Sequence, residues 1–261
     1  MAIGLLIIGD EILSGRRTDK HLPKVVQMLA ERGMRLDWAR VIGDDPQRIT
    51  SVLRECVASG DVVFSCGGIG ATPDDHTRQC AATALGVGLE LHPYAREKIN
   101  QRALEIAEQR GETVDLNSAE NQQRLKMGEF PLGADIIPNP FNRIPGFRCG
   151  HLHFVPGFPE MAHPMIAWTL DTHYAHLHNA TPWIEKSLLV IEVAESRLTP
   201  LMEELERDFP LVKIFSLPGL ARADISWHIE LGAKGEPQQA EQAFARIQQT
   251  LQQMGAEFRL L

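Results

Sequence analysis

The chain has 261 residues, of which 44% are apolar, and its formal net charge is −8 at pH 7. This length allows one large domain or two, and this apolar fraction is enough for a packed core. Nucleic acids and anionic membranes require clustered Lys and Arg, which are scattered here. We therefore expect no nucleic-acid partner and no membrane partner, and the composition favours a small-molecule ligand.

The cysteines and the N-terminus indicate a reduced, cytoplasmic protein. Cys56, Cys66, Cys80 and Cys149 show no CxxC or other metal-site spacing. Nothing at the N-terminus has the pattern of a cleavable signal, and the apolar run 2–8 is far too short to cross a bilayer.

The first third of the chain alternates strand and helix. Residues 2–8 form an apolar run that Gly9 ends, which is typical of a strand buried on both faces of a parallel sheet. Apolar residues recur every three or four positions in 19–32, which predicts a helix that Gly33 caps. The next predicted elements are strand 34–42, a helix from Asp45-Pro46 to near Gly60, and strand 62–66. Short connections between them predict a doubly wound, mostly parallel sheet with right-handed crossovers.

A glycine turn follows strand 62–66 and contains Gly67, Gly68 and Gly70. Thr72 can cap free amides and Pro73 lacks the amide that would go unpaired, so the pair predicts a helix start. A helix start after a glycine turn binds anions. We therefore expect the backbone of the turn and the Thr72 hydroxyl to bind a phosphate or diphosphate.

Acidic residues follow the three predicted strands. Ligands of open parallel sheets bind beyond the carboxyl ends of the strands, so we expect these residues to converge on one rim. A phosphate there would arrive with a divalent cation, Mg²⁺, Mn²⁺ or Co²⁺. The acidic segments are Gly9-Asp10-Glu11, with Ser14-Gly15 just beyond, Gly43-Asp44-Asp45, and Asp74-Asp75.

The rest of the first half contains one long irregular segment. Residues 139–147 carry prolines and a glycine that oppose regular structure, and such a loop between core strands is usually functional or disordered. The predicted elements around it are helices 93–109 and 119–127, strands 134–137 and 151–155, a turn at 156–159, and a helix from 160 to about 177.

The last third has its own pattern, and a domain boundary is predicted near 178–183. Thr199-Pro200 predicts a helix start, and Ile225, Trp227, Ile229 and Leu231 alternate on one face of a strand. The order βαββαβ is that of a small ferredoxin-like domain. We expect two domains, at 1–178 and 183–261, the second made of strand 186–193, helix 199–208, strands 211–217 and 224–231, helix 238–254 and strand 257–260.

Several segments in order resemble the molybdopterin-binding-domain family, most closely the N-terminal region of CinA-type proteins. The matching segments are 9–15, 41–45, 67–75, 133–147 and 156–161. Ala71 departs from the proline that is usual in the family, and Asp19-Lys20 from an Asn-Thr-Asn run. The resemblance implies a three-layer sandwich for the first domain.

The resemblance also implies a function and a set of site residues. Family members are associated with molybdopterin handling or with hydrolysis of ADP-ribose to AMP and ribose 5-phosphate. It implies a homo-oligomer, a dimer or a trimer. Because the chain stops at Leu261, we expect the activity of the amidase domain of longer relatives to be absent. The expected ligand-binding residues are Gly9, Asp10, Glu11, Ser14, Gly15, Gly67, Gly68, Gly70, Thr72, Asn139, Pro140, Pro145, Gly146, Gly157 and Glu160.

Two main functional hypotheses follow. In the first, Asp44, Asp74 and Asp75 bind the cation, and Asp44 and Asp75 serve in metal-dependent diphosphate hydrolysis, with a water attacking phosphorus. In the second, the chain is a non-catalytic module that binds a pterin, molybdopterin or a nucleotide. A third hypothesis is that the chain serves mainly as an oligomeric scaffold. Related domains assemble through the same fold, and fold alone does not establish function.

Simpler interpretations compete at single residues. A helix-cap role alone would explain Asp75. Asp45 before Pro46 has the pattern of a plain N-cap, so we assign the ligand or metal role to its neighbour Asp44. Cys66 is more typical of a small buried side chain than of a nucleophile. The spacing of His173, His176 and His178 is not a recognised zinc motif. The Gly68–Gly70 pair does not make a dinucleotide fingerprint, because Pro73 takes the place of the third glycine.

Overall fold

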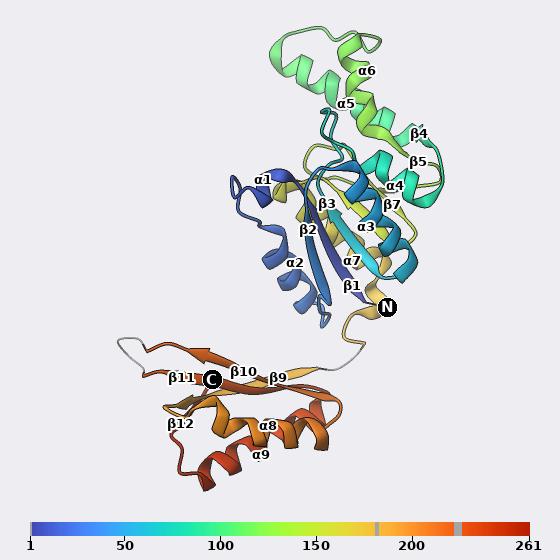
Figure 1. Cartoon of the computed structure of the whole chain (residues 1–261). Coiled ribbons are helices and arrows are strands. Elements are labelled where there is room, and N and C mark those ends of the chain that lie inside the picture. The colour runs from blue at the N-terminus through green and yellow to red at the C-terminus, as the bar shows by residue number, and fades with distance from the viewer. Residues whose placement is uncertain (1, 181–182, 222–225) are drawn as a thin grey trace. The chain divides into compact units, whose positions relative to one another are not determined.

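The computed structural model describes residues 2–180, 183–221 and 226–261 (Figure 1). Contacts divide the chain into two compact units, Met1–His178 and Asn179–Leu261. Within the described ranges, no helix has both the length and the apolarity that crossing a bilayer would require.

The first unit is built on a mostly parallel sheet. In its described part the strand order is β2-β1-β3-β8-β7-β6. The first four run parallel to one another, while β7 is antiparallel to both β8 and β6. The strands are β1 (Ile3–Ile8), β2 (Trp38–Ile42), β3 (Val62–Cys66), β6 (Asp135–Ile137), β7 (Gly146–Cys149) and β8 (Leu152–Val155), and a separate antiparallel pair is formed by β4 (Leu89–Leu91) and β5 (Glu129–Pro131).

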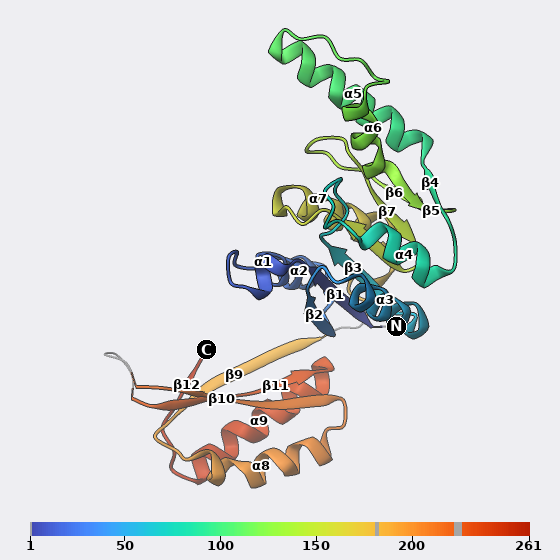
Figure 2. The same cartoon turned by 45° about the horizontal axis from the view of Figure 1, so that its top comes forward.

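Helices cover both faces of this sheet (Figures 1 and 2). Side chains alternate along β1, so Leu5 packs with α2 and α7 on one face while Leu6 packs with α3 on the other. This is the three-layer, mostly parallel α/β fold that the sequence predicts. The helices are α1 (Asp10–Leu13), α2 (His21–Ala30), α3 (Pro46–Ser59), α4 (Thr77–Leu85), α5 (Pro93–Arg110), α6 (Ala119–Leu125) and α7 (Pro159–His173), with short 3-10 turns at Lys126–Gly128 and Ala175–Leu177.

The segments that follow five of the strands lie at the same edge of the sheet. β6 and β8 run in the same direction, because each is antiparallel to β7. The carboxyl ends of β2, β1, β3, β8 and β6 therefore meet at the same edge. Helices α5 and α6 extend beyond it (Figure 2), and α6 contacts the loop after β3 through Gln123, whose Nε2 donates to the Ala71 carbonyl at 2.7 Å.

Helix α4 begins at Thr77, so the predicted start at Thr72-Pro73 is wrong. The Thr77 amide donates to the Gly68 carbonyl at 3.0 Å and its hydroxyl donates to the Gly67 carbonyl at 3.1 Å. The Asp75 amide donates to the Thr72 carbonyl at 3.1 Å, which makes 72–75 a separate turn. Contacts between distant turns, and not the local Thr-Pro pair, fix the helix start.

The irregular run predicted at 139–147 is shorter in the structure, because Gly146 and Phe147 open β7. A Cβ at Gly146 would lie 2.3 Å from the Phe154 carbonyl oxygen, so glycine allows this strand to approach β8. The Phe147 ring stacks on Phe130 and Phe154, with ring centroids 4.7 and 4.5 Å apart. Strand β2 is also shorter than predicted and starts at Trp38 rather than Met34.

The second unit has the predicted βαββαβ order. Its antiparallel sheet runs β10-β11-β9-β12, and α8 and α9 pack their apolar residues against one face. This is the ferredoxin-like arrangement. The elements are β9 (Ile184–Ile191), α8 (Glu195–Asp208), β10 (Val212–Gly219), β11 (His228–Gly235), α9 (Pro237–Gln253) and β12 (Phe258–Leu260).

In this unit one local prediction is wrong, and another falls partly outside the described part of the chain. Thr199-Pro200 lies inside α8, whose N-cap is Ala194, and the Thr199 hydroxyl donates to the Glu195 carbonyl of the preceding turn. Asp224 and Ile225 lie outside the described residues. Trp227 precedes β11 and is exposed, whereas Ile229 and Leu231 are buried in the core.

Candidate functional site

The ends of β1 and β2 are joined by a reciprocal pair of hydrogen bonds. The Asp10 amide donates to Oδ2 of Asp44 at 2.9 Å, and the Asp44 amide donates to Oδ1 of Asp10 at 3.3 Å. A Cβ at Gly43 would lie 2.3 Å from Oδ1 of Asp10, so a larger residue there would displace the Asp10 carboxylate from this pair. The two strand ends therefore hold their carboxylates close together at the carboxyl edge.

Asp44 is the residue at which the acidic strand ends interact. Burial raises the pKa of Asp44, the Asp10 amide lowers it, and the charges of Asp10, Glu11 and Asp74 raise it further. The acidic rim, which we define as Asp10, Glu11, Asp44 and Asp74, thus combines residues from three strand ends. In the part of the chain that the structure describes, no three His, Cys, Asp or Glu side chains are arranged to hold a metal ion.

Asp75 shapes the loop after β3. Its Oδ2 accepts hydrogen bonds from the Thr72 amide, at 2.9 Å, and from the Thr72 hydroxyl. A Cβ at Gly70 would lie 2.5 Å from the same oxygen. Asp74 is exposed, and the Thr72 side chain lowers its pKa. Of this acidic pair, Asp75 holds the turn and Asp74 extends to the rim.

Gly67 and Gly68 allow close packing of the strand ends. Gly67 has φ +109°, and a Cβ there would lie 2.2 Å from the Ile8 carbonyl oxygen. Gly68 has φ +67°, and a Cβ there would lie 2.2 Å from Oγ1 of Thr77. Both glycines are therefore needed by the fold itself, in addition to any contact with a ligand.

Arg78 lies buried next to this loop and was not among the residues that sequence reasoning selected. It is 2% exposed, and its Nη2 donates to the Gly70 carbonyl at 2.5 Å. Its Nε and Nη1 have no hydrogen-bond partner among the residues that the structure describes. Burial lowers the pKa of Arg78, while the charges of Asp75 and Glu129 raise it. The only feature of the sequence that points to Arg78 is its position directly after Asp74-Asp75-His76-Thr77. An arginine at such a position is more typical of the exposed face of a helix.

The ends of β1 and β8 contribute further predicted residues. Ser14 caps α1, with its amide donating to the Asp10 carbonyl at 2.8 Å, and Gly15 is exposed with φ +71°. A Cβ at Gly157 would lie 3.4 Å from the Gly67 Cα, so the loops after β3 and β8 are in contact. Glu160 is exposed in the first turn of α7. Gly9 is buried at the end of β1, and its amide donates to the Ile42 carbonyl at 3.0 Å.

His21 and His163 form a pair on the α2 side of this edge. Neither histidine is among the site residues predicted from the sequence. His21 is buried, its Nε2 lies 3.1 Å from the Gly157 carbonyl oxygen, and its ring meets that of His163 edge-on at 5.3 Å. Within the described ranges, Nδ1 of His21 and Nε2 of His163 have no hydrogen-bond partner. Burial, followed by the charge of His21, lowers the pKa of His163.

The loop after β6 is organised around buried Asn139. Its Nδ2 donates to Oδ1 of Asn142 at 2.8 Å and to the Ile144 carbonyl at 2.9 Å, and its Oδ1 accepts from the Phe141 amide at 3.0 Å. Pro140 is exposed, whereas Pro145 and Gly146 are buried where the loop enters β7. Asn139 and Pro140 also line a cavity, but Pro145 and Gly146 do not belong to its wall.

Other polar groups belong to the core. Burial lowers the pKa of His153 to about 3, with its Nδ1 3.2 Å from the Val63 carbonyl oxygen and its Nε2 3.3 Å from the Tyr174 hydroxyl. Cys66 is fully buried, and burial raises the pKa of its thiol. Asp45 caps α3 by accepting from the Arg48 amide at 2.7 Å.

Comparison with known proteins places these features in a family. The sequence model described as a probable molybdopterin binding domain matches residues 4–176. A CinA-like protein of Citrifermentans bemidjiense is 33% identical over 207 residues, which cover 78% of this chain and 47% of that relative. A CinA-like protein of Synechococcus sp. strain RCC307 is 28% identical over 265 residues, which cover 97% of this chain and 59% of that relative. The chain thus spans about half the length of these curated relatives.

A solved structure agrees with the sequence comparison. The crystal structure of the protein CinA from Thermoplasma acidophilum, described as having unknown function, superposes with a TM-score of 0.55 and 25% identity. The match covers 66% of this chain and 98% of that chain. The chain belongs to the molybdopterin-binding-domain family and is a CinA-like member of it.

Proposed function

We propose that the chain binds a small molecule that carries a phosphate or a diphosphate at the carboxyl edge of the six-stranded sheet, together with a divalent cation. The observation that carries the proposal is the reciprocal pair of hydrogen bonds that holds the carboxylates of Asp10 and Asp44 together at this edge. Burial, followed by the charges of Asp10, Glu11 and Asp74, raises the pKa of Asp44. A cation at the acidic rim would relieve this repulsion and would attract a phosphate. Membership of the molybdopterin-binding-domain family supports a phosphate-bearing ligand.

The acidic rim fits a cation that arrives with its ligand. Mg²⁺ is usually bound through one or two carboxylates plus substrate phosphates, and it keeps several waters. The carboxylates of Asp10 and Asp44 each accept one backbone amide and retain further lone pairs. In this proposal Asp44 and Asp74 contact the cation, and Asp75 supports them by holding the turn at Thr72.

The loop after β3 supplies the positive side of the proposed site. The buried Arg78 guanidinium donates to the Gly70 carbonyl, and two of its nitrogen atoms have no partner in the described part of the chain. Little solvent reaches its charge to screen it. A phosphate on this loop would lower the cost of keeping that charge buried. The predicted ligand-binding residues Gly68 and Gly70 would present backbone to the same group.

Hydrolysis of a diphosphate such as ADP-ribose is the second candidate. The cation would polarise a phosphoryl oxygen and lower the pKa of a water. Asp44 would hold the cation beside that water, which is consistent with the catalytic role that the sequence predicts for it. The alternative is a module that binds a pterin, molybdopterin or a nucleotide without turnover.

Thermal-shift measurements and product analysis distinguish these functions. The protein is mixed with ADP-ribose, FAD or neopterin, with and without Mg²⁺, Mn²⁺ or Co²⁺, and AMP is measured by chromatography. The proposal expects a cation-dependent rise in melting temperature with a phosphate-bearing compound and none with Asp44→Asn. AMP formation that Asp44→Asn loses favours the hydrolase, while a shift without AMP favours the binding module. No cation-dependent shift with ADP-ribose or FAD would contradict the proposal.

A further inference from the structure

A cavity of about 390 Å³ lies at the amino ends of the parallel strands β3 and β8, on the edge of the sheet opposite the acidic rim. We call it the amino-edge cavity. Its wall is formed by the last turn of α3 with Gly60, the end of α4, the turn after β5, and the turn between β7 and β8. Its volume falls within the roughly 300–1,000 Å³ that is usual for small-molecule pockets.

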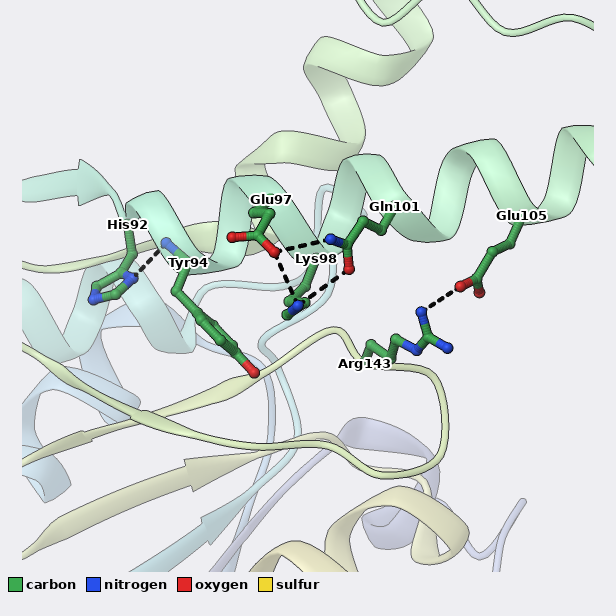
Figure 3. A network of polar contacts seen from close by, with 7 residues as sticks. All are labelled: His92, Tyr94, Glu97, Lys98, Gln101, Glu105 and Arg143. Carbon is green, nitrogen blue, oxygen red and sulfur yellow. Dashed lines mark hydrogen bonds and ion pairs between the residues drawn. The ribbon is translucent and has the colours of Figure 1, made fainter.

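The amino-edge cavity differs in charge from the cavity after β6. The wall of the latter includes Lys98 and Arg143. Lys98 donates to Glu97 at 3.0 Å, and Arg143 pairs with Glu105 (Figure 3). Among the described residues, the wall of the amino-edge cavity contains no Asp, Glu, Lys or Arg, and His151 is its most polar side chain. A ligand of this cavity therefore has a largely apolar body.

The wall is apolar and leaves room for a ligand. Val57, Val87 and Leu132 lie in it and remain 41%, 38% and 59% exposed. Burial raises the pKa of the Cys149 thiol to about 12, as expected beside an apolar surface. An apolar ligand would displace water from these side chains, which is favourable. A Cβ at each of three wall glycines would meet no described atom within 4 Å, and these are Gly60, Gly133 and Gly150.

The C-terminal ends of α3 and α4 both meet the cavity. Val57 lies in the last turn of α3, Gly60 is its C-cap, and Leu85 is the last residue of α4. The C-terminal end of a helix carries a partial negative charge, because its last carbonyls have no partner within the helix. The last turns, 56–59 and 82–85, contain no Lys, Arg or His. No side chain of these turns therefore balances the negative helix ends.

The arginines that act on the thiols of the wall are paired with carboxylates. They are Arg40 and Arg148, whose charges lower the pKa values of the thiols against the effect of burial. Arg40 donates to Glu55 at 2.5 Å, and Arg148 pairs with Asp135. Asp61 adds a negative charge near the wall. The two helix ends and this carboxylate thus favour a cation at the cavity.

We propose that the amino-edge cavity binds a small amphiphilic amine, with its apolar body against Val57, Val87 and Leu132 and its ammonium at the C-terminal ends of α3 and α4. The helix carbonyls accept hydrogen bonds from the ammonium, and its positive charge complements the negative helix ends. His151, exposed in the same wall, can accept a further hydrogen bond through a neutral ring nitrogen. A carboxylate of the same shape is repelled by the same groups. This site is independent of the phosphate site at the acidic rim.

Three probes of similar shape and different charge test the proposal. At pH 7, 2-phenylethylamine is a cation, 2-phenylethanol is neutral and phenylacetate is an anion. We expect the amine to bind the full chain about tenfold more tightly than the alcohol, as two helix-end interactions predict, and phenylacetate to bind more weakly than the alcohol. Calorimetric titration measures the affinities. Amide chemical shifts locate the bound amine and are expected to change at Gly60, Gly133 and Gly150.

Val57→Lys and Val57→Met separate the effect of charge from that of space. Both place a long unbranched side chain in the last turn of α3, but only lysine balances the helix end. We expect Val57→Lys to bind the amine about fivefold more weakly than Val57→Met, and the two variants to bind the alcohol equally. A cation in the last turn stabilises a helix, so Val57→Lys should melt no lower than Val57→Met. Leu132→Ala should weaken the amine and the alcohol alike, by about threefold.

Three results would overturn the proposal. Phenylacetate that binds as tightly as the amine would show that the helix ends do not select a cation. Equal amine binding by Val57→Lys and Val57→Met would show that the ammonium does not lie at the end of α3. Amine binding that Asp44→Asn abolishes, without chemical-shift changes at the three wall glycines, would place the amine at the acidic rim instead.

Discussion

Asp10 and Asp44 each accept, on a carboxylate oxygen, a hydrogen bond from the other residue's backbone amide, at 3.3 and 2.9 Å. These bonds connect the ends of the neighbouring parallel strands β1 and β2. They keep two negative charges close together at the edge where α/β sheets bind their ligands. Burial, together with the charges of Asp10, Glu11 and Asp74, raises the pKa of Asp44.

Asp44→Asn is expected to stabilise the free protein at neutral pH. The pKa of Asp44 is raised above the usual 3.8, so the folded protein binds this proton more tightly than the unfolded chain. Ionisation therefore lowers stability as pH rises through the folded-state pKa, and the loss persists at pH 7. Asn keeps an oxygen for the Asp10 amide and removes the charge. Urea unfolding at pH 7 and near pH 3 checks this, and a variant less stable than the wild type at pH 7 would contradict it.

Gly67→Ala is expected to destabilise the protein by about 3 kcal/mol or more, because it combines an unfavourable φ with a backbone clash. The added Cβ would lie 2.2 Å from the Ile8 carbonyl oxygen. Gly15→Ala is the control, since Gly15 also has positive φ but has open space around it, and it should cost about 1 kcal/mol. Equal free energies of unfolding for the two variants would show that the ends of β1 and β3 are not packed this closely.

Asp75→Ala is expected to lower the free energy of unfolding by about 1–2 kcal/mol, because the Thr72 amide and hydroxyl lose their acceptor. Asp75→Asn keeps an acceptor oxygen and should lose less than half as much. Denaturant titration of both variants measures the difference. If Asp75→Ala is as stable as the wild type, Asp75 does not hold the turn, and a direct role at the acidic rim becomes the better account.

His153 is expected to make the protein sensitive to acid. Burial lowers its pKa to about 3, whereas the unperturbed value is 6.5. The unfolded chain then binds one more proton between these values, so stability is fully present above about pH 6.5 and is lost as pH falls toward 3. The predicted slope from this group is about 1.4 kcal/mol per pH unit. Stability measured against pH should fall more steeply for the wild type than for His153→Asn, and identical slopes would refute the assignment.

Some of this protein could be predicted from its sequence because the relevant patterns are local. The apolar run ending at Gly9 and the alternation that follows identified the parallel sheet, and the sheet in turn placed Asp10 and Asp44 at one edge. Asp45 before Pro46 has the N-cap pattern, and the structure shows that bond.

The remainder depends on contacts between distant segments. Thr77 starts α4 because it bonds to Gly67 and Gly68, which overrides the Thr-Pro signal five residues earlier. Tyr94 and Trp168 come from separate helices that only the folded chain brings to one cavity. Arg78 looks like a surface helix residue in the sequence, and its burial follows from the loop packed over it.

The central claim is that the acidic rim binds a phosphate-bearing ligand with a cation. Calorimetric titration of ADP-ribose in the presence of Mg²⁺, for the wild type, Asp44→Asn and the exposed control Glu90→Gln, tests it most directly. We predict binding by the wild type and Glu90→Gln that depends on Mg²⁺, and affinity at least tenfold weaker for Asp44→Asn, about the loss of one charge-assisted contact. Equal affinity in all three proteins, or affinity that does not change when Mg²⁺ is removed, would contradict the claim.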